Sequence, residues 1–94
     1  MDNRPSVELL ESIHCFPGTY RMKAIGVAAD DFAGRVIGAA SAELASPGEL
    51  VHTVRATPGG RHVAITLELT VQTAEQVRAV YAAIQQVDGL TILF

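Results

Sequence analysis

The 94 residues include seven Lys and Arg against ten Asp and Glu, and this net charge of −3 at pH 7 argues against binding nucleic acid or an anionic membrane through overall charge. Hydrophobic residues make up 49% of the chain and aromatic residues 5%, so we expect residues 1–94 to form a single domain with a core of small aliphatic side chains. One cysteine excludes an internal disulfide, and neither a secretory signal nor an apolar run of the ~20 residues that a membrane helix needs is evident. We therefore expect a cytoplasmic protein.

The first residues are polar and lead into a short helical turn. We expect residues 1–4 to be disordered. Ser6 stands in the capping position before the segment VELLESI, which predicts that a helical turn begins at the next residue. The apolar side chains expected to lie against the domain are Val7, Leu10 and Ile13.

The segment Thr19–Val27 is predicted to form the first strand, because apolar and basic side chains alternate along it. The apolar members are Tyr20, Met22 and Ala24, and the basic members are Arg21 and Lys23. Gly26, near the end of this strand, indicates a bulge or the close approach of another backbone.

A helix is predicted over residues 31–45. Asp30 and Asp31 supply a cap and a favourable negative charge at its start. Apolar side chains then recur at helical spacing, at Phe32, Val36, Ala40 and Leu44. A stripe of small residues lies on one flank, formed by Gly34, Gly38 and Ala42. Because glycine weakens a helix, we interpret this stripe as a place where another backbone comes close.

The segments Leu50–Thr57 and Arg61–Gln72 are predicted to form a hairpin. The second of them alternates strictly between apolar and polar residues, which is typical of a strand with one buried face. A reversal at Pro58-Gly59-Gly60 pairs position 56 with 63, 54 with 65 and 50 with 69. Three side chains of the first segment are then expected on the buried face: Leu50, Val54 and Ala56.

The last predicted elements are a helix and a short strand. Thr73 to Gln76 has the pattern of a capping box, and Asp88-Gly89 ends the helix ahead of the strand Leu90–Phe94. The order β-α-β-β-α-β predicts an α+β, ferredoxin-like sandwich, with strand order 4-1-3-2 and both helices on one face of an antiparallel sheet. The expected core residues are Phe32, Val36, Val54, Ile65, Leu67, Leu69, Val80, Tyr81 and Ile84.

Three sequence blocks together resemble the YbeD-like family of small, uncharacterised bacterial proteins, whose fold is similar to the ACT-type regulatory domain. The blocks are FPGTYRMKAIG, TPGGRHVAITLELTVQTAEQV and VDGLTILF, which begin at Phe16, Thr57 and Val87. The resemblance implies a regulatory or binding role and carries over no catalytic residue. It also implies, as one possibility, an effector site near the loop after the first strand, at Gly26, Asp30 and Asp31.

Two histidine arrangements are candidates for chemical sites. His14 and Cys15 are sequence neighbours, and neighbours in an extended segment point to opposite sides, so they do not form a nucleophile pair. The hairpin register places His52 and His62 on opposite faces of the sheet, which argues against a metal site between them. We therefore predict no catalytic residue, no metal and no cofactor.

The face of the sheet opposite the helices is expected to be open. Its predicted members include Arg21, Lys23, Ile25, Val51, Arg55, Ala64, Thr66 and Glu68. The two central strands place no aromatic side chain on this face, so the stacking platform of an RNA-recognition sheet is missing and no nucleic acid is expected. Arg21 or Lys23 is expected to pair with Glu68 across strands.

The sequence thus favours a non-enzymatic regulatory or protein-binding module, and the alternative is an ACT-like sensor of a small effector. Partners are expected to be another protein or a second copy of the chain, and not a membrane. A symmetric dimer is expected either through the edge strand Leu50–Thr57 or through stacked open faces at Ile25, Val51 and Ala64. A plainly solvated face with cross-strand ion pairs is the competing interpretation.

Overall fold

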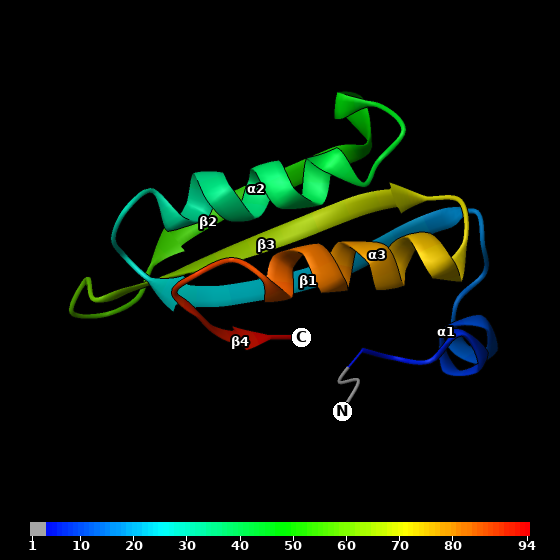
Figure 1. Cartoon of the computed structure of the whole chain (residues 1–94), viewed down its shortest axis with the longest axis horizontal. Coiled ribbons are helices and arrows are strands. Elements are labelled where there is room, and N and C mark those ends of the chain that lie inside the picture. Colours follow the sequence, from blue (N-terminus) through cyan, green and yellow to red (C-terminus); the bar gives the residue numbers. More distant parts are fainter. Residues whose placement is uncertain (1–3) are drawn as a thin grey trace.

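A four-stranded antiparallel sheet, in the order β2-β3-β1-β4, forms the base of the structure. A computed structural model describes residues 4–94. The strands are β1 (Gly18–Val27), β2 (Leu50–Ala56), β3 (His62–Val71) and β4 (Leu90–Leu93). The helices are α1 (Val7–Ile13), α2 (Phe32–Ala42) and α3 (Ala74–Gln85), with a 3₁₀ turn at Pro47–Glu49. Figure 1 shows α2 and α3 lying on one side of the sheet, so the predicted ferredoxin-like arrangement is confirmed.

The hairpin register agrees with the prediction. Leu50 lies opposite Leu69, Val54 opposite Ile65 and Ala56 opposite Val63. The Thr57 N–H donates to the His62 carbonyl at 3.0 Å, which closes the turn. Because side chains alternate between the two faces of a strand, this register commits the apolar face of β3 to the helix side.

The core lies between the sheet and the helices and contains eight of the nine expected residues. Its members include Tyr20, Met22, Phe32, Val36, Ile65, Leu67, Leu69, Val80, Tyr81 and Ile84. Val54 is the exception: it faces the helix side but remains 48% exposed, and Ala56 beside it is also exposed. The prediction that they are buried was wrong, because β2 is an edge strand and no strand among residues 4–94 lies beyond it.

The predicted caps hold the helices in place. Ser6 accepts a hydrogen bond from the Leu9 N–H, and Thr73 accepts one from the Gln76 N–H. The side-chain amide of Gln76 also donates, through Nε2, to the backbone carbonyl of Glu43 at 3.1 Å. This bond ties the start of α3 to the end of α2.

The N-terminal helix α1 packs on the domain through Leu10. Ile13, which was also expected to lie against the domain, is 65% exposed. Of the segment expected to be disordered, residues 1–3 lie outside the described residues, whereas Arg4 donates to the Arg78 carbonyl at 3.5 Å. No helix in the described part of the chain is long and apolar enough to cross a membrane.

Gly26 is the point where β1, α2 and β4 come closest. A Cβ added there would lie 2.3 Å from the Phe32 ring and 2.6 Å from the Gly89 carbonyl oxygen. The pairing of β1 with β4 also shifts between Ile25 and Gly26, so both the close approach and the bulge expected at this glycine are confirmed. In contrast, a Cβ at Gly38 would meet nothing within 4 Å, so the small-residue stripe of α2 is not covered by another backbone at that position.

These two glycines give a matched prediction. Gly26→Ala is expected to lower the free energy of unfolding by about 1–3 kcal/mol, because the added methyl group overpacks the contact with Phe32. Gly38→Ala is expected to raise it by about 0.5–1 kcal/mol, because the position is open and alanine favours the helix. Urea denaturation of both variants measures the difference, and equal stabilities would contradict the role assigned to Gly26.

Candidate functional site

The open side of the sheet carries basic, hydroxyl and exposed apolar side chains next to one another. The register places three rows of side chains across it: Val51, Glu68 and Arg21; Thr53, Thr66 and Lys23; and Arg55, Ala64, Ile25 and Ile92. All eight residues predicted for this face therefore lie together, on strands β1, β2 and β3. The Arg21 guanidinium contacts the Glu68 carboxylate at 3.3 Å, which confirms the predicted cross-strand pair.

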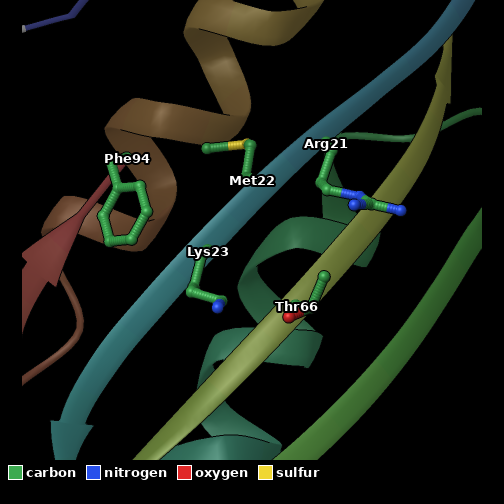
Figure 2. Close-up of a pocket in the computed structure, with 5 residues that line it drawn as sticks. All are labelled: Arg21, Met22, Lys23, Thr66 and Phe94. Atoms are coloured by element: carbon green, nitrogen blue, oxygen red, sulfur yellow. The ribbon is translucent and has the colours of Figure 1, made fainter.

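A hollow of about 280 Å³ lies on this face beside β1. Figure 2 shows the side chains of Lys23 and Thr66 close together between β1 and β3, with the ring of Phe94 on the other side of β1. The backbones of Lys23 and Phe94 exchange two hydrogen bonds, of 2.6 and 3.0 Å, so their side chains share one face. The hollow therefore combines an ammonium group, a hydroxyl group and an exposed aromatic ring.

A second hollow, of about 110 Å³, lies on the other side of the same Lys23–Thr66 pair. Its lining consists of Lys23, Thr53, Arg55, Ala64 and Thr66. Glu68 is the one acidic side chain of this face among residues 4–94, and it contacts Arg21. Lys23 and Arg55 therefore have no acidic side chain as a partner in the described structure. Two cations and two threonine hydroxyls around so small a space are suited to an anionic group.

Ile92 and Phe94 belong to this face, although the sequence analysis did not assign them to it. Ile92 lies opposite Ile25 and is 49% exposed, and Phe94 is 60% exposed. Both Leu90 and Leu93 pack against the core, so the strand does not alternate simply. The extra residue at the bulge, Thr91, reverses the alternation and turns Ile92 outward. The only sequence signal for this reversal was Gly26, opposite the bulge.

The loop after β1, the alternative site, also borders a hollow. It measures about 320 Å³ and its lining is Ala28, Ala29, Asp30, Asp31, Phe32, Ala33 and Val63. The Asp31 carboxylate accepts the Gly34 N–H at 3.3 Å and so acts as the predicted cap of α2. Gly26 lies under the Phe32 ring and takes no part in the lining. Of the three residues expected there, Asp30 alone keeps its side chain uncommitted among the described residues.

The remaining reactive side chains stay apart or are buried. No hydrogen bond joins His14 to Cys15 in the described structure, and the His14 ring instead lies 4.7 Å from the Tyr20 ring between centroids. Within residues 4–94, no three His, Cys, Asp or Glu side chains gather closely enough to hold a metal ion. The Tyr20 and Tyr81 hydroxyls lie 3.3 Å apart in the core. Burial, and then the hydrogen bond with Tyr20, raise the pKa of Tyr81, so its phenol stays neutral near pH 7.

The chain is similar to known proteins over most of its length. Over residues 11–94 it matches a family described as "Protein of unknown function (DUF493)". The chain belongs to this family. It is 32% identical over 75 residues to a UPF0250 protein of Shewanella frigidimarina, covering 80% of this chain and 83% of that protein. It is 30% identical over 83 residues to a UPF0250 protein of Shewanella woodyi and 28% identical over 83 residues to one of Shewanella piezotolerans, covering 88% of both chains in each case.

The DUF493 match confirms the resemblance drawn from the sequence blocks. It spans every strand of the sheet together with α2 and α3. The family description and the names of these relatives state no activity. The chemistry of the site therefore has to be argued from its geometry.

The buried tyrosine pair predicts how stability depends on pH. The pKa of Tyr81 is raised in the folded state, whereas the unfolded chain releases this proton near pH ~10. Stability contributed by the neutral phenol is thus present below that pH and is lost as the pH rises above it. Tyr81→Phe should make the free energy of unfolding fall less steeply above pH ~10. Urea denaturation at several alkaline pH values tests this, and equal slopes for both proteins would contradict it.

Proposed function

We propose that this protein is a cytoplasmic, non-catalytic binding module that holds an acidic segment of a partner protein on the open face of its sheet. The observation that carries the proposal is the pair Lys23 and Arg55, two cations without an acidic partner in the described structure, which line one hollow with two threonines. The hollow at the loop after β1 is lined by two titratable side chains, Asp30 and Asp31, and Asp31 is committed to capping α2. The absence of an acid–base pair there among the described residues supports binding over catalysis.

The charge of the face supports an acidic partner. The whole chain has a net charge of −3, yet three basic side chains and one acidic side chain lie on this face. Its positive potential is therefore local, and an anionic segment is attracted to this side of the molecule in preference to the rest. Because these side chains are partly exposed, the attraction should weaken as salt is added.

Apolar side chains beside the cations support a protein partner. Phe94 is 60% exposed, Ile92 49% and Val51 61%. Aromatic and aliphatic anchors among charged side chains are typical of protein interfaces, where the apolar contacts supply binding energy and the charges select the partner. A segment that alternates acidic and apolar residues would satisfy both kinds of contact.

The binding proposal predicts the effect of reversing one charge. A fluorescent peptide of alternating Glu and Leu residues is the probe, and a peptide with Lys in place of Glu is its control. Lys23→Glu is expected to weaken binding of the acidic peptide at least tenfold, because it replaces an attraction with a repulsion at the shared wall of both hollows. Fluorescence anisotropy at low and at physiological ionic strength measures the dissociation constants.

The matched control is Arg61→Glu, which makes the same change of charge on an exposed residue of the hairpin turn outside both hollows. It should leave the affinity nearly unchanged. Equal weakening by the two variants would mean that only net charge matters, and that result would contradict a site on the open face.

The second candidate function is a small-effector sensor, which the hollow at the loop after β1 favours. Its lining contains two aspartates and no cation. The neighbouring Arg35 donates to the carbonyl oxygens of Asp30 and Asp88, both at 2.9 Å. An effector with an amino group is therefore better matched to this hollow than one that presents only a carboxylate.

A thermal-shift screen of amino acids, amines and nucleotides tests the sensor. A ligand at a concentration of 100 times its dissociation constant stabilises the fold by about 2.7 kcal/mol, which raises the melting temperature of a domain of this size by roughly 10 °C or more. Asp30→Ala should abolish the shift, whereas the cap Asp31 is left intact so that α2 keeps its start. No shift across the panel would exclude the sensor for those compounds.

A further inference from the structure

The outer edge of β2 is the least protected part of the sheet. The Thr57 N–H donates to the His62 carbonyl, so this end of β2 faces β3. Because the pairing alternates along an antiparallel strand, the N–H and C=O groups of Arg55, Thr53 and Val51 also point to β3. Those of the intervening residues point away from the sheet: Leu50, His52, Val54 and Ala56. Among residues 4–94 no strand lies beyond them, since β2 ends the sheet.

The two edges of the sheet differ in how they resist pairing. β4 is four residues long and bulged, and both features discourage the addition of a strand. β2 has seven residues with neither proline nor glycine, and Arg55 is its only charged side chain apart from the titratable His52. Val54 on the helix side and Val51 on the open side are 48% and 61% exposed, so this edge presents an exposed apolar side chain on each face.

We infer that a second copy of the chain pairs with this edge, β2 against β2 in antiparallel orientation, to form a continuous eight-stranded sheet around a two-fold axis at Thr53. This inference is independent of the acidic partner proposed above. In this register position 53 faces its own copy, 51 faces 55 and 52 faces 54, so all seven residues of the strand are paired. The outward N–H and C=O groups of His52 and Val54 then meet each other across the axis.

The charges of the edge favour a second copy as its occupant. Arg55 of one copy lies beside Val51 of the other, and Glu68 lies opposite Val51 on the next strand. Two strand spacings separate Arg55 from that glutamate, about 10 Å between Cα atoms, which the two long side chains can span together. The two-fold axis generates this cation–carboxylate pair twice, and neither Arg55 nor His52 faces itself.

The pairing would also join the two candidate binding surfaces. Thr53 lines the smaller hollow of the open face, and in this register it lies on the axis. The hollows of the two copies would then adjoin across the axis on one continuous face. An acidic segment would meet Lys23 from both copies, with Arg55, paired to Glu68 of the other copy, beside it.

Disulfide cross-linking tests the register directly. In a Cys15→Ser background, Thr53→Cys places two thiols in a non-hydrogen-bonded antiparallel pair with Cα atoms about 4.5 Å apart, which is within the range of a disulfide. We expect a covalent dimer to form under mild oxidation at micromolar protein, at least tenfold faster than in the matched variants. One matched variant is Val51→Cys, where the Cα atoms of position 51 in the two copies lie about 13 Å apart along the strand. The other is Thr70→Cys, at an exposed position on β3.

A backbone variant separates edge pairing from other modes of association. Val54→Pro removes one outward N–H and leaves the bonds to β3 intact, a position where an edge strand tolerates proline, whereas Val54→Thr keeps the N–H. Light scattering should show a dimer for wild type and Val54→Thr and a monomer for Val54→Pro, with circular dichroism confirming that each is folded. A monomeric wild type, or equal cross-linking at Thr53, Val51 and Thr70, would overturn the inference.

Discussion

Burial of one face of β3 is the constraint on which the rest of the structure depends. Ile65, Leu67 and Leu69 are fully buried, and β3 pairs with β1 on one side and β2 on the other. A shift of either pairing by one residue would turn those side chains to solvent, so the register of the three strands is set together. The same constraint directs Ala64, Thr66 and Glu68 to the opposite face. The open face is therefore a direct consequence of how the core forms.

A second constraint acts where Gly26 meets the Phe32 ring and the Gly89 carbonyl. Since α2 and the turn before β4 both press on β1 here, the short strand β4 joins the sheet through a bulge. The bulge lets Leu90 and Leu93 contact the core while Ile92 and Phe94 face outward. The contact between Gly26 and Phe32, on the helix side of the sheet, thus influences the open face, where Ile92 and Phe94 lie near Lys23.

The open face and the β2 edge act as neighbouring surfaces with different chemistry. The edge offers unpaired backbone groups flanked by Val51 and Val54, a surface that another strand can complete. The face offers cations and an aromatic ring, a surface suited to side chains of opposite charge. Thr53 belongs to both, so occupation of one surface by a partner would change the surroundings of the other.

The sequence by itself determined the order of the elements, the hairpin register and the membership of the open face from Arg21 to Glu68, because each follows from local periodicity or from a turn. It also identified the caps at Ser6 and Thr73 and placed a third at Asp30-Asp31, where Asp31 proved to be the cap, because caps depend on a few adjacent residues. The tertiary structure alone decided the exposure of Val54, the open space beside Gly38 and the outward orientation of Ile92 and Phe94. Burial at a sheet edge depends on what packs beyond the strand, and the facing of β4 depends on a bulge imposed by distant contacts at Gly26. Local periodicity predicts which face of a strand a side chain occupies. Whether that face is covered depends on the packing of other elements, which is set by the tertiary structure.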